Sequence, residues 1–268
     1  MSEELINKVL AEVVKKMGGD DPAPSAAPAP APTPAAGTLP AVTEFVGTNV
    51  LGDTIGMVIA NVDPKLRAMM KLEKDFRSIG ILGARTGAGP HIFAADEAVK
   101  ATNSEILTIE LPRDTKGGAG HGSLIIFGAE DVSDARRAVE VSLGELDRTF
   151  GDVYGNDAGH LEFQYTARAS YALNKAFGAP LGKAFGITVG APAGIGVVLA
   201  DTAVKAATVD VIGYASPAGG TSFSNEVISF LSGDSGAVRQ AIIAAREVGI
   251  PLLGALGATP ESTTTPYI

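Results

Sequence analysis

The sequence of 268 residues contains no cysteine. Disulfides, thiolate zinc sites, iron–sulfur clusters and a cysteine nucleophile are therefore excluded. Charge is also scarce, since only 19% of the residues are charged, and 30 acidic against 21 basic residues give a net charge of −9. Because no basic surface dominates such a chain, we expect no nucleic-acid partner.

The sequence shows neither a long membrane-spanning run nor a secretory signal. Residues 184–200 form an uncharged, apolar stretch of 17 residues, but glycines and a proline interrupt it, and a spanning helix needs roughly 20 apolar residues. The N-terminus lacks the basic region, apolar core and cleavage site of a secretory signal. We expect a cytoplasmic protein without a membrane partner.

The N-terminal segment predicts an amphipathic helix at residues 1–17, followed by a linker rich in proline and alanine at residues 18–42. One stripe of the helix is apolar and consists of Leu5, Ile6, Val9, Leu10 and Val13. A helix this short is marginal alone in water, and a proline-rich linker acts as a semi-rigid spacer. We interpret residues 1–41 as a segment that docks another protein. The alternative is a helix that folds back on its own domain.

The rest of the chain is an internal duplication. The segment Ala95–Ala101 returns as Ala200–Ala206 with one substitution, Glu97 to Thr202, 105 residues later. Further matches keep an offset of 103 to 106 residues: Ile79, Phe127, Asp131 and Arg136 correspond to Phe185, Phe230, Asp234 and Arg239. A period this long indicates a duplicated domain, because solenoid repeats run at roughly 20–50 residues. We predict two domains, at residues 43–153 and 154–268.

Each copy predicts a small sheet with helices packed on it, an α/β (α+β) fold. The first copy predicts strands at 54–62, 78–83, 106–111 and 124–127, with helices starting at Pro64 and spanning 96–102 and 135–149. The second copy predicts strands at 161–166, 185–189, 209–214 and 226–231, with helices at 169–177, 201–207 and 237–248. Residues 83–91 are rich in glycine but lack the end of a phosphate-binding loop, so we interpret them as a turn.

Three segments of the second copy resemble the shell domain of bacterial microcompartments: Ala200–Ala207, Val211–Tyr214 and Gly233–Val238. The first copy matches less well at its end, where residues 130–135 replace the last motif. An extra strand and helix precede each conserved unit, as in the circularly permuted, tandem shell proteins. Residues 43–48, 79–91, 111–123 and 165–171 resemble the tandem shell proteins of propanediol-utilisation microcompartments.

This resemblance implies a structural tile with a mostly antiparallel sheet in each domain. Three chains would form a pseudo-hexagonal homotrimer that packs with other shell proteins in the bacterial cytoplasm and lets small metabolites pass. Residues 1–41 would anchor the enclosed enzyme core, a diol dehydratase. We expect no catalysis and no cofactor, and His91, His121 and His160 are too scattered in the sequence to predict a metal site. The alternative is a protein that binds or senses a polyol in the cleft between its domains.

The resemblance also assigns two sets of site residues. The loops at residues 113–123 and 216–225 would line a central pore, although surface loops are the simpler interpretation; the residues are Lys116, Gly117, Gly118, Gly120, His121, Gly219, Gly220, Thr221 and Ser222. The edge of the tile would contain Lys100, Asn103 and Lys205. Thr208 replaces the asparagine in the second copy. We expect both lysines to act between tiles and to contribute little to the fold.

Overall fold

The computed structural model describes residues 42–72, 74–113, 121–219 and 224–268. The chain divides into two units, Met1–Ala41 and Val42–Ile268. The first unit, which includes the predicted docking helix, lies outside the described residues. Within the described ranges, no helix combines the length and the apolar character needed to cross a membrane.

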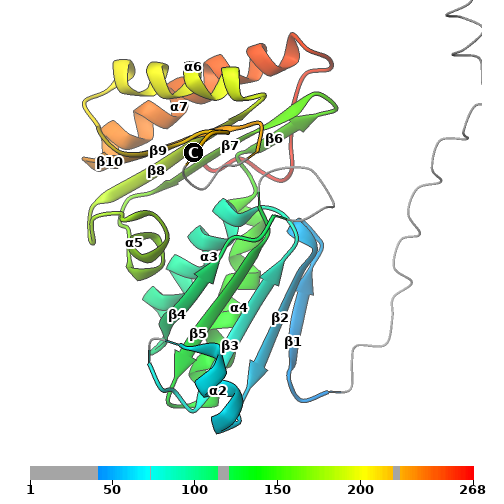
Figure 1. Ribbon diagram of the computed structural model, residues 1–268. Coiled ribbons are helices and arrows are strands. Elements are labelled where there is room, and N and C mark those ends of the chain that lie inside the picture. The colour runs from blue at the N-terminus through cyan, green and yellow to red at the C-terminus, as the bar shows by residue number, and fades with distance from the viewer. Residues whose placement is uncertain (1–41, 73, 114–120, 220–223) are drawn as a thin grey trace, which may run out of the picture. The chain divides into compact units, whose positions relative to one another are not determined.

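The first domain is a five-stranded antiparallel sheet with two long helices on one face (Figure 1). Its strands are β1 (Phe45–Asn49), β2 (Thr54–Ile59), β3 (Ser78–Ala84), β4 (Glu105–Glu110) and β5 (Ser123–Ala129). Its helices are η1 (Leu51–Asp53), α2 (Pro64–Met70), α3 (Ala88–Ala101) and α4 (Val132–Thr149). The strands lie in the order β1-β2-β3-β5-β4, and α3 and α4 pack on each other and on the sheet.

The second domain repeats this architecture. Its strands are β6 (Val153–Asn156), β7 (Gly159–Thr166), β8 (Ala184–Ala191), β9 (Asp210–Ala215), β10 (Val227–Gly233) and β11 (Glu261–Ser262). Its helices are α5 (Tyr171–Phe177), α6 (Ala193–Ala206) and α7 (Ser235–Gly254). The order β6-β7-β8-β10-β9 matches the first sheet, with β11 added beside β6. All strand pairs are antiparallel, and with the repeated strand order this confirms the predicted antiparallel sheets in two tandem domains.

The predicted boundaries of α3 and α6 were wrong at their N-terminal ends. We expected helices from residues 96 and 201, but they begin at Ala88 and Ala193. The expected turn at residues 83–91 therefore ends at Gly87, whose φ of 80° breaks the strand and starts the helix. Pro90 lies in the first turn of α3, where a missing N–H breaks no helical hydrogen bond.

The edge strands β1 and β6 were missed, because short strands that contain glycine carry little alternation of apolar and polar residues. Asp131 is the N-terminal flanking residue of α4, but its side chain caps no N–H of the helix. The predicted boundary between residues 153 and 154 falls at the start of β6, the first strand of the second sheet.

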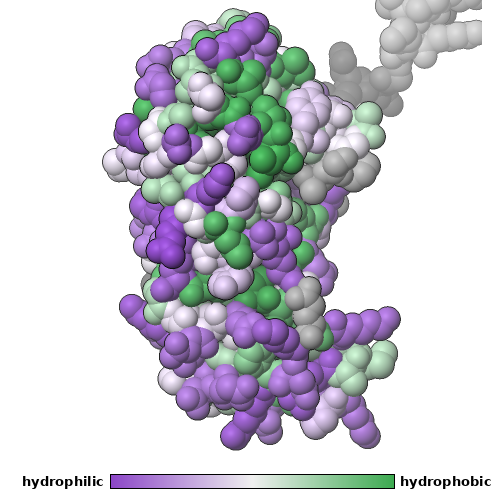
Figure 2. Space-filling model, turned by 90° about the vertical axis from the view of Figure 1, so that its left-hand side faces the viewer, coloured by the Kyte–Doolittle hydropathy of each residue, from purple (hydrophilic) through white to green (hydrophobic). Residues whose placement is uncertain are grey.

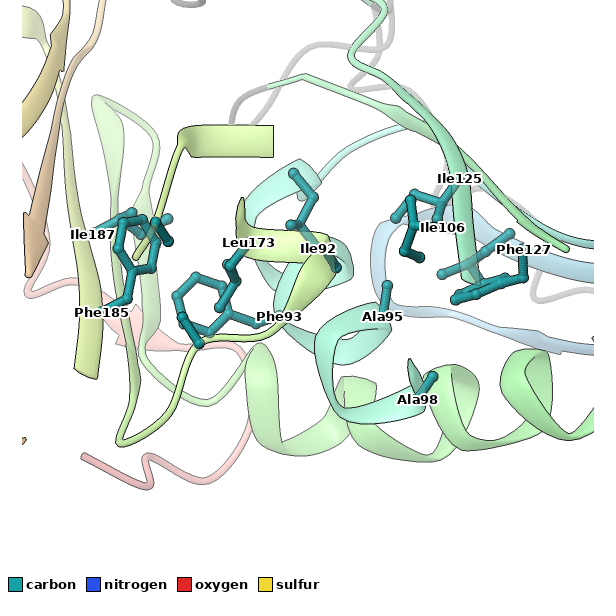
Figure 3. Packing of buried hydrophobic residues seen from close by; sticks show 14 of the residues in the cluster. Ile92, Phe93, Ala95, Ala98, Ile106, Ile125, Phe127, Leu173, Phe185 and Ile187 are labelled. Atoms are coloured by element: carbon teal, nitrogen blue, oxygen red, sulfur yellow. The ribbon is translucent and has the colours of Figure 1, made fainter. Parts of the chain in front are cut away.

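The two domains share one hydrophobic core. The largest cluster of buried residues includes Ile92 and Phe93 from α3, Leu173 from α5, and Phe185 and Ile187 from β8. Figure 3 shows these side chains pointing toward one another from the two domains. The Phe93 and Phe185 rings stack with their centroids 5.9 Å apart. Apolar burial of this kind holds the domains together within one chain.

The C-terminal segment is held at the junction of the domains by the buried carboxylate of Asp152. That carboxylate accepts hydrogen bonds from the Arg246 guanidinium at 2.6 Å and from the backbone N–H groups of Tyr267 and Ile268 at 2.9 and 3.1 Å. The Arg148 guanidinium, at the end of α4, lies 5.0 Å from the centre of the Tyr267 ring. Asp152 is thus the buried acidic partner of the end of the chain, beside further hydrogen bonds from residues 262–264 to the backbone of residues 147–153.

Candidate functional site

Helix α3 provides most of the contact between the two domains. Its residues from Ala88 to Asp96 are all buried, because one face covers the first sheet and another meets the second domain. The second face packs on α5 and β7. The second domain presents the counterpart of α3, which is helix α6.

The carboxylate of Asp96 joins the domains through the start of α5. It accepts hydrogen bonds from the backbone N–H groups of Ser170, at 3.0 Å, and Leu173, at 3.2 Å. The Ser170 side chain makes no capping bond of its own. Asp96 therefore acts as the N-terminal cap of α5 from the other domain, and the helix dipole favours its negative charge.

Lys100 completes this contact. Its ammonium lies 2.9 Å from Asp96 and 2.9 Å from Glu97 and approaches the Thr166 hydroxyl of the second domain. Burial raises the pKa of Asp96, although Lys100 and the backbone hydrogen bonds oppose that shift. Lys100 supports a buried carboxylate, so the expectation that it contributes little to the fold does not hold.

The counterpart of α3, helix α6, leaves its apolar face exposed. Val197 and Val198 correspond to Ile92 and Phe93 at the offset of 105, and they are 49% and 42% exposed, whereas Ile92 and Phe93 are 0% and 2% exposed. In the face shown in Figure 2, hydrophobic residues form a band over the upper part of the molecule, which is the second domain. Helix α6 thus packs on α7 and β8, but among the described residues the face that corresponds to the domain-facing side of α3 stays partly open to solvent.

The counterpart of α5, helix α2, is exposed in the same way. Leu66 corresponds to Leu173 at an offset of 107, and Leu66 is 50% exposed whereas Leu173 is fully buried. Both helices end in a residue with left-handed backbone, Lys71 with φ of 51° and Gly178 with φ of 69°, which fixes this correspondence. One chain thus contains one complete interface and the two separate halves of another.

The predicted edge residues lie in different surroundings. The Lys205 side chain is 72% exposed and pairs with Asp201 at 2.7 Å, whereas the Lys100 side chain is only 25% exposed. Asn103 is exposed, just beyond the end of α3. The contact of these residues between tiles stays a prediction.

Most of the predicted pore residues lie outside the described residues: Lys116, Gly117, Gly118, Gly120, Gly220, Thr221 and Ser222. Gly219 is described, and its backbone exchanges two hydrogen bonds of 3.0 Å with Ser216 in a tight turn. The His121 side chain is buried, and its backbone carbonyl accepts the N–H of Ala88. The docking residues Leu5, Ile6, Val9, Leu10 and Val13 also lie outside the described residues.

The structure brings together four ionisable side chains that the sequence separates. Glu226 lies 3.2 Å from His160 and 3.7 Å from His121, and Glu162 is buried beside them. His121, just before β5, and His160, on β7, lie far apart in the sequence, but both meet Glu226 in the segment before β10. With Leu111 and apolar residues of the second domain, three of the four line a cavity of about 40 Å³ between the domains: His121, Glu162 and Glu226.

The protonation states of this cluster follow from burial and neighbouring charge. Burial raises the pKa of Glu162 to about 7, and His160 only partly offsets it. Burial also disfavours the charged forms of His160 and Glu226. Their mutual hydrogen bond and opposite charges favour the charged forms and together outweigh burial. The pKa of His160 is therefore raised and that of Glu226 lowered. Glu162 therefore titrates near neutral pH, and the raised pKa of His160 favours its ion pair with Glu226.

We expect Glu162→Gln to make the stability of the protein less dependent on pH. With the pKa of Glu162 raised to about 7 in the folded state, the wild type loses free energy of unfolding as the pH rises from about 4.5 to 7. The loss corresponds to about 1.4 kcal/mol per unit of pKa shift, and the neutral amide avoids it. Thermal unfolding at pH 5 and pH 8 measures the difference.

The matched control is Glu226→Gln, because the pKa of Glu226 is lowered instead. A lowered pKa contributes stability above the ordinary value of a carboxylate. At pH 8 we therefore expect Glu162→Gln to be more stable than the wild type and Glu226→Gln to be less stable. A Glu162→Gln protein that is as sensitive to pH as the wild type would contradict the assignment.

The third histidine is separate from this cluster. His91 is buried in α3, where its ring contacts the Thr54 hydroxyl and the Gly87 carbonyl at 2.6 Å each. Burial lowers the pKa of His91 to about 4, so it is neutral near pH 7. In the part of the chain that the structure describes, no three or more histidine or acidic side chains are arranged to hold a metal ion.

Comparison with known proteins identifies the family. The sequence model of the BMC domain matches residues 78–156 and 184–258, one match in each half of the duplication. The chain belongs to the bacterial microcompartment shell proteins. Each BMC match begins at the strand that precedes an interface helix, β3 or β8. Strands β1 and β2 precede the first match, β6 lies at its end, and β7 lies between the two matches.

Two relatives are similar to this chain in sequence over its whole length. The chain is 62% identical to a bacterial microcompartment shell protein PduB of Citrobacter freundii and 63% identical to that of Salmonella typhimurium, covering 100% of this chain and 99% of each relative. A crystal structure of a trimeric shell protein PduB is 55% identical, with a TM-score of 0.82 over 85% of this chain and 100% of that one. The predicted family is confirmed, and the alternative of a sensory protein finds no support among these relatives.

Proposed function

We propose that three copies of this shell protein close into a pseudo-hexagonal tile. The observation that carries the proposal is the repeated interface: α3 packs on α5 within the chain, while their counterparts α6 and α2 remain exposed. If α6 of one copy packs on α2 of the next, each contact is head-to-tail. Contacts of this type form a ring when the rotation closes, and two domains per chain fill six positions with three chains. The similarity to a trimeric shell protein also supports three chains per ring.

The mass of the purified protein in solution tests this proposal. Light scattering should give about 82 kDa, three times the 27.2 kDa of one chain. A particle of 27.2 kDa would contradict the tile, because a single chain leaves two apolar helix faces in water. Exposed apolar surface on both α2 and α6 would then lack an explanation.

We place these tiles side by side with other shell proteins in a microcompartment of the bacterial cytoplasm, with Lys100, Asn103 and Lys205 at the edge. The exposed Lys205 supports this position, since its side chain is available to a neighbouring tile. The protein then acts as a structural wall and not as an enzyme. The PduB name of its relatives supports a compartment for the utilisation of propanediol.

The two lysines allow the edge to be tested separately from the fold. We expect Lys205→Ala to keep the thermal stability within about 0.5 kcal/mol but to reduce the formation of protein sheets in electron micrographs. Lys100→Ala should lower the stability by about 1–3 kcal/mol, because it removes a partner of the buried Asp96 carboxylate. Normal sheets from Lys205→Ala would overturn the assignment of Lys205 to the edge.

We place the loops at residues 113–123 and 216–225 around the axis of the trimer, where they line a pore for small metabolites. The two loops occupy equivalent positions in the two domains, which supports this assignment. The first loop follows β4 and leads to β5, and the second follows β9 and leads to β10. Six such loops would then meet at one axis. The glycines among them permit close approach of backbones.

The N-terminal segment provides the last part of the proposed function, which is to anchor the enclosed enzyme core, a diol dehydratase. The apolar stripe of the predicted helix and the spacer behind it support a docking role. Deleting residues 1–41 should leave the trimer intact and release the enzyme from the shell, as measured by co-sedimentation. Changing Leu5, Val9 and Val13 to aspartate should do the same, because charge on the stripe prevents its burial. A truncated protein that falls to monomers would contradict docking.

A further inference from the structure

The N-termini of the counterpart helices α5 and α2 are capped by different residues. The Ser170 side chain caps nothing, and Asp96 of α3 accepts the N–H groups of α5. In α2, Asp63 accepts the N–H groups of Lys65 and Leu66 at 2.8 and 3.1 Å. The carboxylate that corresponds to Asp96 therefore finds its usual binding site already occupied when it approaches α2.

That carboxylate is Asp201 of α6, which corresponds to Asp96 at the offset of 105. In the proposed trimer, Asp201 of one copy meets the N-terminus of α2 in the next copy, where Asp63 already provides a negative charge. Two carboxylates at one helix end repel each other, and their desolvation makes the repulsion stronger. Among the described residues, Asp201 pairs with Lys205 at 2.7 Å.

Lys65 is in the right place to provide the second cation. It corresponds to Ala172 at the offset of 107, and Ala172 is fully buried in the contact between the domains. Lys65 is exposed in the single chain, so the contact between copies would cover a side chain that needs a partner of opposite charge. The geometry points to an ion pair between Lys65 of one copy and Asp201 of the next, which replaces the cap that Asp96 provides inside the chain. This inference rests on the proposed trimer.

The two contacts therefore differ in their charged residues. The contact within a chain is centred on Asp96 and Lys100, whereas the proposed contact between copies adds Asp63 and Lys65 of α2 to Asp201 of α6.

The test gives α2, in the contact between copies, the residue types that α5 has in the contact within the chain. Lys65→Ala should weaken the trimer at least about tenfold in dissociation constant, measured by analytical ultracentrifugation of the full chain. The double variant Asp63→Ser with Lys65→Ala gives α2 the residue types of α5 at both positions, so Asp201 can cap α2 directly. We expect this double variant to recover the affinity of the wild type within about threefold.

The matched control is Lys71→Ala, which removes a lysine from the other end of α2. Its counterpart Gly178 is exposed in the contact within the chain, so this variant should form trimers as the wild type does. A Lys65→Ala protein with unchanged affinity, or a double variant weaker than Lys65→Ala, would overturn the ion pair while leaving the trimer in place. A wild type that is itself monomeric would instead contradict the proposed function.

Discussion

Replacing Val198 by aspartate is expected to turn the trimer into a folded monomer. Val198 is the counterpart of Phe93, which is buried between the domains, and it is 42% exposed in the single chain. A carboxylate there is solvated in the monomer but loses its water in the trimer without a partner. Three such charges per ring should shift light scattering from about 82 kDa to the 27.2 kDa of one chain. Leu66→Asp, on the opposing helix α2, should have the same effect.

Val50→Asp is the control for this experiment. Val50 is 88% exposed after β1, and its counterpart at the offset of 107 is already an aspartate, Asp157. It should therefore form trimers normally. Trimers of unchanged affinity from both Val198→Asp and Leu66→Asp would show that α6 and α2 do not meet between copies, and the proposed ring would have to use other surfaces.

Replacing Asp152 by alanine is expected to destabilise the single chain more than any other substitution considered for this protein. The Asp152 side chain is fully buried, and its loss leaves the mostly buried Arg246 without its carboxylate and two backbone N–H groups without an acceptor. Breaking a buried pair in this way costs about 3–5 kcal/mol. The thermal midpoint should fall by about 10 °C, as measured by circular dichroism.

The C-terminal segment should loosen at the same time, because its last two residues bind Asp152 through their backbone. Limited proteolysis that releases the C-terminal residues faster than in the wild type would confirm this. Asp157→Ala, in the exposed turn between β6 and β7, is the control and should stay within about 0.5 kcal/mol of the wild type. Equal midpoints for the two variants would mean that Arg246 and the C-terminus find other partners.

Much of the architecture could be predicted from the sequence, because the motifs of one domain occur twice along the chain. The correspondence of Ala95–Ala101 with Ala200–Ala206 located both interface helices, and the pattern of apolar strands between turns predicted the two sheets. The boundaries of α3 and α6 could not be predicted in the same way. Glycine-rich stretches such as residues 83–91 have no strong periodicity, and only their packing against the sheet makes them helical.

The exposure of counterpart residues could not be predicted at all. Phe93 and Val198 occupy the same position of the same repeated helix, but one is buried by the second domain and the other is open. A repeat in the sequence says that two surfaces are alike, and it says nothing about which of them is already covered. The positions of Lys100 and Lys205 differ for the same reason, so equal motifs predict unequal contributions to the fold.

The sequence by itself determined the duplication, the family and the type of fold, since these depend on patterns along the chain. Only the tertiary structure decided that Asp96 caps α5, that Asp152 holds the C-terminus, and that His121 and His160 meet at Glu226. Each of these contacts joins residues about 60 to 115 positions apart, and no local pattern encodes such a distance. They exist because the sheets and the shared apolar core bring those residues together, and burial then requires every charged group to find a partner.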